Sequence, residues 1–216
     1  MNLRRLHRRD GQRGQGLVEF ALVLPVILVL VLSVADLGFI FGRLGSLGYG
    51  SREGARTGAA LARGGVPYCD TAPTDPNLID PVKVDAVVVA AVQRVLESPD
   101  SGIDMSKIQE IRIFQANDAG AEAGPVNVWT YAGHRAGPDI DPETGAAFID
   151  FTAASRSWPV CRRVNETPDP DSIGVTVTYT YDFVTPLPAL VNAISGGALS
   201  LTLSETTVMA LNPTIN

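Results

Sequence analysis

An apolar stretch near the N-terminus decides the fold of this chain: LVEFALVLPVILVLVLSVA, residues 17–35. The 16 residues from Phe20 to Ala35 carry no charge, and as an α-helix they would extend about 24 Å. A bilayer core of about 30 Å needs about 20 residues. The helix reaches that length if it continues through Phe41 and includes Asp36. We therefore predict a helix that spans a membrane.

A cleaved secretory signal peptide is the alternative interpretation of this stretch. Such a signal has an apolar region of about 7–15 residues and then a small-residue cleavage site. Here the charge-free region lies at that upper limit, and more helical sequence follows it in place of an Ala-x-Ala exit. The pattern favours a span that is kept in the mature protein.

Charge is distributed unevenly around the stretch. The first 14 residues hold five arginines and one aspartate, a net charge of +4, whereas the whole chain of 216 residues carries −6, so that the remaining 202 residues carry −10. A basic tip before an acidic body argues against a general nucleic-acid binder, whose basic surface would lie on the folded domain. By the positive-inside rule it favours a single-pass protein with its N-terminus in the cytoplasm and its C-terminal body outside.

The sequence around Glu19 resembles the class III signal of type IV pilins and pseudopilins. It reads RGQGLVEF over residues 13–20, with glycine after the basic leader and glutamate five residues later. The resemblance implies cleavage after Gly14 by a prepilin peptidase, with Gln15 as the new N-terminus. Glu19 would then set the register of the subunit by meeting the α-amino group of a neighbour, an attraction that is strong in a low-dielectric environment. The alternative for Glu19 is an interfacial residue just outside the hydrocarbon.

Two separated motifs narrow the resemblance to the TadE-like family, small pseudopilins of tight-adherence (Flp-type IVb) pilus assembly. The first is GQGLVEFALVLP at residues 14–25, and the second is SREGAR at residues 51–56. The likeness covers residues 13–60 and departs from the family pattern at Phe20, where tyrosine is frequent. It implies a minor pilin or pseudopilin in the bacterial cytoplasmic membrane or in the pilus. Its partners would be membrane lipid, other pilins and a membrane assembly platform.

Small residues recur at helical spacing after the span. Five glycines form three pairs that are four residues apart along a helix face: Gly38 with Gly42, Gly50 with Gly54, and Gly54 with Gly58. Small residues let two helices approach closely, so we expect this face to pack. A flexible hinge is the alternative, because each interior glycine costs about 1 kcal/mol of helix stability. The neighbouring Arg52, Glu53 and Arg56 form either a solvated charged face or, as the resemblance implies, a docking site for a partner subunit.

The rest of the chain predicts an α+β domain. Apolar residues recur at i, i+3, i+4 and i+7 from Val84 to Leu96, as on one face of a helix. Alternation of apolar with polar or small residues from Ile173 to Phe183 predicts a strand with one buried face. A further strand is predicted at residues 108–115, and weaker signals lie at 126–131 and 147–151. Alternating Leu with Ser or Thr predicts a partner strand at residues 199–211, joined to the strand at 173–183 by a short helical connection at 186–197. The fold that we expect is a long, pilin-like N-terminal transmembrane helix, followed by a small antiparallel sheet packed with one amphipathic helix.

These elements divide the chain into a basic leader at residues 1–14, the long helix at 15–63 and an extracytoplasmic domain at 64–216. The last part contains both cysteines, Cys69 and Cys161. Two cysteines outside the cytoplasm favour a disulfide, which would close a loop of about 90 residues. The alternative is two unpaired thiols, because the sequence does not give the distance between them.

Signals for catalysis or for a cofactor are weak. The sequence has no His-Glu-x-x-His, Cys-x-x-Cys or Gly-x-Ser-x-Gly motif, and His134 stands in a glycine-rich turn typical of a surface loop. Residues Asp139 to Asp150 faintly resemble a calcium loop, but Pro142 interrupts the pattern, and a solvated acidic loop is the simpler interpretation. We expect no enzyme, no cofactor, no bound metal and no nucleic acid. The alternative to a pilus subunit is an uncleaved single-pass protein that displays an adhesive or ligand-binding domain.

Overall fold

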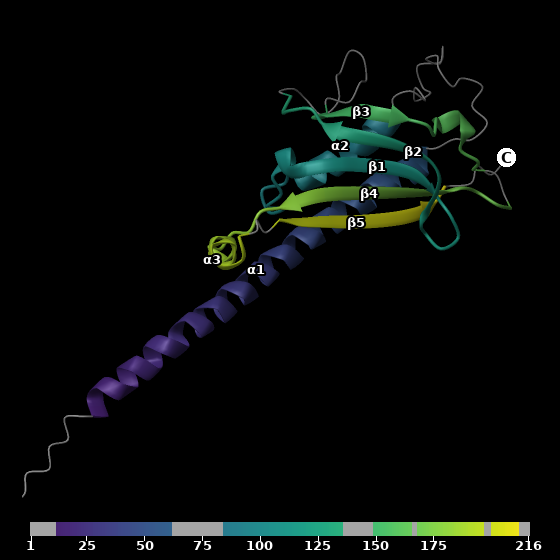
Figure 1. Ribbon diagram of the computed structural model, residues 1–216. Helices are drawn as coiled ribbons and strands as arrows, with labels where there is room; N and C mark the ends of the chain where they lie inside the picture. Colours follow the sequence, from purple (N-terminus) through teal and green to yellow (C-terminus); the bar gives the residue numbers. More distant parts are fainter. Residues whose placement is uncertain (1–11, 62–83, 136–148, 166–167, 197–199, 212–216) are drawn as a thin grey trace, which may run out of the picture. The chain divides into compact units, whose positions relative to one another are not determined.

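The computed structural model describes residues 12–61, 84–135, 149–165, 168–196 and 200–211, which form three α-helices, two short 3-10 helices and five strands (Figure 1). Internal contacts group the chain into two compact units. The first unit contains Met1–Phe39 and Phe183–Leu199, and the second contains Ile40–Asp182 and Ser200–Asn216. Most of the predicted leader lies outside the described residues.

Helix α1 runs from Gln12 to Leu61 and contributes residues to both units. Its 50 residues make a rod of about 75 Å, whereas a bilayer core is about 30 Å thick. Pro25 lies inside the helix and has no N–H to donate to the carbonyl of Ala21. Since α1 is more than twice as long as a membrane span, its later turns are free to pack on the rest of the chain.

Five strands form one antiparallel sheet in the order β3-β2-β1-β4-β5. Their bounds are Ile108–Ala116 for β1, Glu122–Tyr131 for β2, Phe151–Arg156 for β3, Ser172–Tyr181 for β4 and Leu201–Ala210 for β5. A long N-terminal helix followed by an antiparallel sheet with short helices confirms the predicted α+β class.

Strand β4 has the alternation that its sequence predicts. Its buried apolar side chains are Ile173, Val175, Val177, Tyr179 and Tyr181. The strand ends at Tyr181, two residues before the predicted end, and Phe183 belongs to the other unit. At the β1–β4 pairing Phe114 lies over Gly174, where an added Cβ would be 2.3 Å from the ring.

Other strand boundaries move for physical reasons. Strand β2 begins four residues before the predicted start because its N-terminal end pairs with β1, Glu122 opposite Ala116. Strand β3 runs on to Arg156 along β2, well beyond the predicted end at residue 151. Strand β5 is an edge strand, in which Leu203 is buried and Leu201, its first residue, is 36% exposed.

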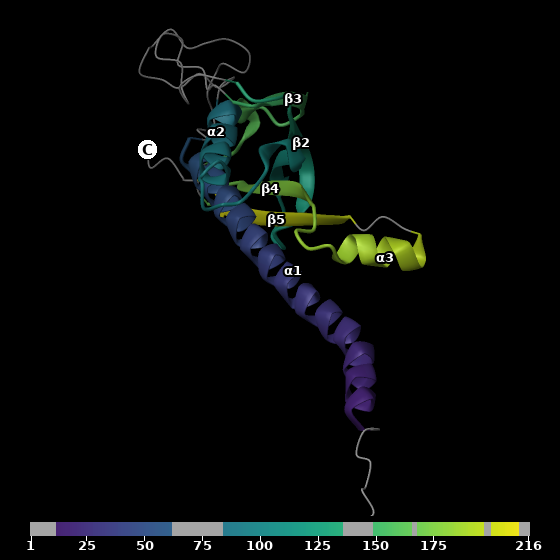
Figure 2. The ribbon, with the colours of Figure 1, turned by 90° about the vertical axis from the view of Figure 1, so that its left-hand side faces the viewer.

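Helix α2, Val84–Leu96, covers one face of the sheet together with the last turns of α1 (Figure 2). Asp85 in its first turn and Arg94 in its last turn complement the helix dipole. The apolar stripe of α2 includes Val88, Val92 and Leu96, all buried. The face therefore carries both the amphipathic helix that we predicted and the outer part of the long pilin-like helix.

A buried polar cluster holds α2 to β2 and to the segment that follows β3. The Asp85 carboxylate accepts hydrogen bonds from Arg163 Nη2 at 2.7 Å and from Asn127 Nδ2 at 2.6 Å. The Arg163 guanidinium also lies 4.4 Å from the centre of the Trp158 ring. Because buried charges are stable only when paired and hydrogen-bonded, this cluster fixes α2 in place.

Candidate functional site

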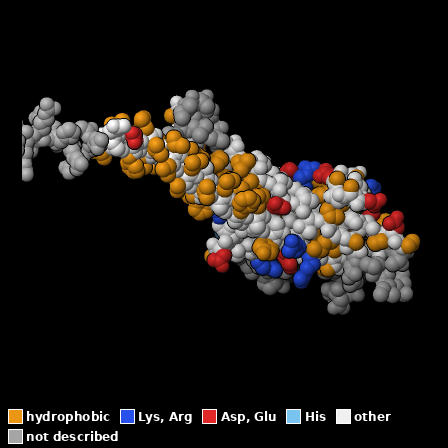
Figure 3. Space-filling view, turned by 90° about the horizontal axis from the view of Figure 1, so that it is seen from below, with side chains coloured by type: hydrophobic (Ala, Val, Ile, Leu, Met, Phe, Trp, Pro, Cys, Tyr) orange, Lys and Arg blue, Asp and Glu red, His pale blue; other side chains and the backbone are white. Residues whose placement is uncertain are grey.

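The first candidate is the apolar half of α1, which we define as residues 17–41. Most of its large apolar side chains are exposed in this chain, up to 72% at Leu22, and Figure 3 shows hydrophobic side chains gathered along the helix. Gly14–Leu61 is long and apolar enough to cross a membrane, and its most apolar window is not buried by the chain. A surface of this kind needs lipid or other protein helices to cover it.

The predicted processing residues lie at the beginning of this helix. Gln15 and Glu19 are one turn apart, and Gln15 Nε2 donates a hydrogen bond to Glu19 Oε1 at 3.1 Å. Gly14 is exposed, and a Cβ added to it would have no described atom within 4 Å. The structure thus places Gln15 on the face that carries Glu19, while cleavage and registration stay predictions.

The five glycines of the predicted packing face lie in two different environments. A Cβ added at Gly38 or Gly42 would meet no described atom within 4 Å. At Gly50 it would be 3.0 Å from Leu96, at Gly54 2.6 Å from Val92, and at Gly58 2.5 Å from Ile173. The last three glycines therefore admit α2 and β4 within the same chain, whereas the first two remain open.

The turns that contain these close contacts form what we call the packed half of α1, residues 47–61. Leu47 and Ala55 are fully buried there. Ser51 Oγ lies 2.9 Å from Thr207 Oγ1 of β5, so the packed half also contacts the last strand of the sheet.

A shallow groove of about 500 Å³ lies between α1 and β5. It is lined by Phe41, Leu44, Gly45, Gly48, Tyr49, Arg52 and Glu205. The guanidinium of Arg52 lies 5.9 Å from the ring centre of Tyr49. Glu53 pairs loosely with Arg56 at 3.9 Å on the exposed side. The structure therefore separates the predicted docking group: Arg52 lines the groove, and the other two form a solvated pair.

Asp36 is a polar residue whose partner the sequence does not reveal. It is buried, and its carboxylate accepts hydrogen bonds from Thr185 Oγ1 and from Thr185 N, the latter at 3.3 Å. Thr185 precedes helix α3, Leu187–Ser195, which was predicted as a short helical connection at residues 186–197. The two partners lie 149 positions apart in the sequence, so local patterns give no signal for their contact.

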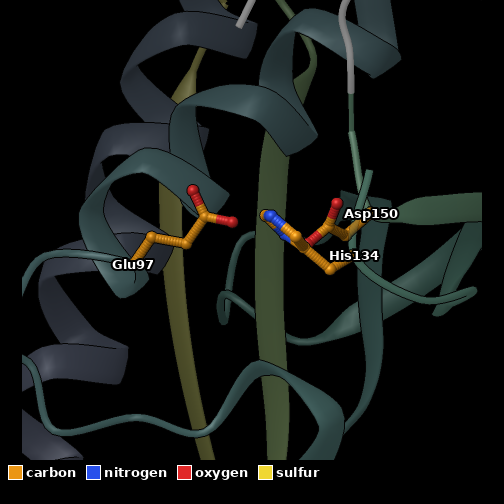
Figure 4. A group of neighbouring side chains, drawn as sticks. All are labelled: Glu97, His134 and Asp150. Carbon is orange, nitrogen blue, oxygen red and sulfur yellow. The ribbon is translucent and has the colours of Figure 1, made fainter. Parts of the chain in front are cut away.

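A cluster of Glu97, His134 and Asp150 lies in the second unit (Figure 4). One potential ligand atom from each lies within 4.8 Å of the others. The buried Asp150 carboxylate accepts a hydrogen bond from Arg135 N at 2.6 Å and lies 3.0 Å from His134 Nδ1. The pKa of Tyr131 is raised by desolvation and then by the charge of Asp150.

One imidazole and two carboxylates are suitable ligands for a divalent cation. In this chain, however, hydrogen-bond donors from neighbouring residues already contact both carboxylates. Gln93 Nε2 donates to Glu97, and Gln93 Oε1 accepts from Asp150 N, both at 2.8 Å. The second of these bonds fastens Asp150, directly before β3, to the end of α2. His134 is 74% exposed, as expected of a surface turn. The predicted acidic loop falls mostly on residues 136–148, outside the described residues.

The predicted disulfide joins a described residue to one that is not. Cys161 lies in a 3-10 helix, Val160–Arg162, while Cys69 falls outside the described residues. The Cys69–Cys161 pairing therefore stays a prediction.

Comparisons with known proteins bear on the N-terminal helix. Residues 14–56 match a family model described as TadE-like protein. No curated protein and no solved structure matches the chain. The matched residues lie entirely within α1 and contain both sequence motifs on which the resemblance rests. The N-terminal segment of this chain is therefore TadE-like, and together with its apolar helix it indicates a membrane protein associated with the tight-adherence pilus system.

Proposed function

We propose that this protein is a minor pilin or pseudopilin that acts in assembly of a tight-adherence pilus. The observation that best supports this role is the apolar half of α1, whose exposed Leu, Val, Ile and Phe side chains require cover from outside the chain. In this role the helix lies in the cytoplasmic membrane, with the N-terminus in the cytoplasm and the sheet domain outside. Lipid covers the helix before assembly, and helices of other pilins cover part of it afterwards.

The N-terminal turn supports processing and registration. Cleavage after Gly14 by a prepilin peptidase would turn the backbone nitrogen of Gln15 into an ammonium group. Glu19 is already within hydrogen-bond distance of the Gln15 side chain, so its carboxylate lies one turn from the new charge. In a low-dielectric environment an unpaired carboxylate is costly, and the ammonium of a neighbouring subunit would stabilise it.

Two surfaces of α1 are available for partner subunits or for the assembly platform. The open glycines Gly38 and Gly42 leave room for a second helix backbone. The groove beside Arg52 offers aromatic rings and a cation at the edge of the sheet. The role that we propose is structural and not enzymatic, and it needs no cofactor.

Processing is tested by the intact mass of the protein from membranes of a host that carries the matching peptidase. We expect a mature chain that begins at Gln15, and the loss of this product in Gly14→Ala. Gly16→Ala is the matched control, because Gly16 is equally open and lies outside the cleavage bond. A full-length wild-type chain in that host would instead support the uncleaved single-pass display protein.

Registration is tested by crosslinking in the same membranes. Glu19→Ala is expected to stay in the membrane but to lose most of its crosslinks to other pilins. Glu53→Ala is the control, because it removes a carboxylate that makes one loose, exposed ion pair. Equal crosslinking in both variants, with normal piliation, would refute the role of Glu19.

A further inference from the structure

Asp36 fixes the depth of α3 along α1. The Thr185 hydroxyl donates a hydrogen bond to the Asp36 carboxylate and accepts one from Leu187 N at 3.3 Å. Thr185 thus connects a side chain of α1 to the first backbone N–H of α3. Because hydrogen bonds are short, the beginning of α3 lies at the level of Asp36.

That level lies near the outer edge of the hydrocarbon, about 6 Å inside it if the core begins at Phe20. The charge-free span begins at Phe20, and Asp36 follows 16 residues later, or about 24 Å along the helix. The hydrocarbon core is about 30 Å thick. A carboxylate near this boundary needs hydrogen-bond donors from the protein, and Thr185 supplies two of them.

The composition of α3 and its N-terminal loop suits the same environment. Residues 183–196 contain no Asp, Glu, Lys, Arg or His, so no charge has to be desolvated at the membrane surface. Val184 in the loop is 57% exposed. Ala189 and Ala193 of the helix are exposed as well. An apolar segment beside a membrane-spanning helix continues the lipid-facing surface of that helix.

Part of the backbone at the two ends of α3 is satisfied within the chain. Its first N–H is bonded to Thr185, and Pro186 and Pro188 have no N–H to satisfy. At the other end Gly196, with a positive φ of 70°, donates its N–H to Asn192 O at 2.8 Å. Unpaired backbone groups are what usually exclude a helix end from the hydrocarbon boundary.

We propose that α3 is a second membrane contact, a short helix that lies in the outer interface of the bilayer and binds lipid through its apolar residues. At nine residues it is about 14 Å long, too short to span, so it lies on the membrane. This inference rests on the proposed membrane anchoring by α1. Two contacts with the bilayer would restrict the rotation of the protein about the axis of α1.

The test is fluorescence quenching of an added tryptophan by brominated lipid. The full-length protein is placed in phosphatidylcholine–phosphatidylglycerol vesicles whose acyl chains carry bromine either near the headgroup or near the bilayer centre. Ala193→Trp reports on α3, Val29→Trp on the middle of the span, and Gln109→Trp on an exposed position of β1. The signal of the buried native Trp129 and Trp158, measured in the wild type, is subtracted.

We expect headgroup-proximal bromine to reduce the Ala193→Trp signal about twofold, because an interfacial helix inserts about 5–10 Å. Val29→Trp should respond most to central bromine, and Gln109→Trp to neither. If Val29→Trp is quenched while Ala193→Trp behaves like Gln109→Trp, the lipid contact of α3 is refuted and the anchor stands. If Val29→Trp is unquenched, the proposed anchoring fails, and the inference fails with it.

Discussion

The two halves of α1 differ in how their residues meet the rest of the chain. The apolar half has the larger side chains, yet Phe41 is 69% exposed, whereas Leu47 at the beginning of the packed half is fully buried. In the packed half glycine, alanine and serine let α2 and β4 approach the helix backbone. Close contacts at small residues therefore distinguish the half that packs inside the chain. Large apolar side chains without internal cover mark the half that meets lipid or partners.

The largest effect is expected from the predicted disulfide, which would fasten the segment after the packed half to the sheet domain. Cys161→Ser should lower the free energy of unfolding by about 4–5 kcal/mol, because a loop of about 90 residues is no longer closed. Denaturant unfolding of the protein in detergent measures this change in the free energy of unfolding. The double variant with Cys69→Ser should lose no more than the single one, and two thiols alkylated without reductant would contradict the bridge.

A slightly smaller effect is expected from the buried polar cluster that fixes α2, the helix that packs against the packed half of α1. Asp85→Ala leaves the buried Arg163 without its carboxylate, which costs about 3–5 kcal/mol. Unfolding followed by the fluorescence of Trp129 and Trp158 measures this loss. Carbonate extraction should still find the chain in the membrane, since the apolar half is unaffected.

Glu122→Ala is the matched control for Asp85→Ala. Its partner Arg112, at 2.7 Å, is partly exposed, so the loss should be about 0–1 kcal/mol. Equal losses in the two variants would mean that the buried cluster does not hold α2.

The same substitution, glycine to leucine, made once in each half of α1, compares the two halves directly. Gly54→Leu places side-chain atoms where Val92 and Val175 already lie, and overpacking of this kind should cost about 3 kcal/mol. Gly38→Leu enters open space in the apolar half and should leave the thermal unfolding of the sheet domain unchanged. If both variants unfold at the same temperature, the distinction between the halves is wrong.

The smallest effect concerns the contact that ties the apolar half to α3. Thr185→Val removes the hydroxyl that donates to the buried Asp36 carboxylate, a loss of about 2 kcal/mol, because a hydrogen bond to a charged group contributes about 1.5–3 kcal/mol. Local opening should become easier, which amide hydrogen exchange in α3 would measure as a rate about 30-fold faster. Thr185→Ser keeps the hydroxyl and should exchange like the wild type; faster exchange there too would assign the effect to packing.

Much of the fold could be predicted from sequence because it follows short-range periodicity. A period of two over Ile173–Tyr181 and a helical stripe over Val84–Leu96 each need only neighbouring residues to be read. The order of the strands is different, because β4 pairs with β1 across the intervening β2 and β3, and local sequence does not encode that pairing. The edge position of β5 follows from that order.

Local sequence is equally insufficient to predict the contacts of the candidate site. Regular glycine spacing defines a helix face, but it does not tell that Gly54 meets Val92 while Gly42 meets no described atom. The bonds from Thr185 to Asp36 and from Gln93 to Asp150 join segments 149 and 57 residues apart. What covers a face, and which distant donor satisfies a buried carboxylate, are properties of the tertiary structure.

The contact between Ser51 and Thr207 has a consequence for biogenesis. The two residues are 156 positions apart, so at ordinary rates of synthesis the packed half of α1 waits about 8–30 s for the strand that completes its surroundings. Helix α2 can cover part of its glycine face early in that interval, but the positions that meet β4 and β5 stay uncovered until those strands are made. The segment made first is thus among the last to be buried, and any chaperone that shields it must leave before β4 and β5 can close over the helix.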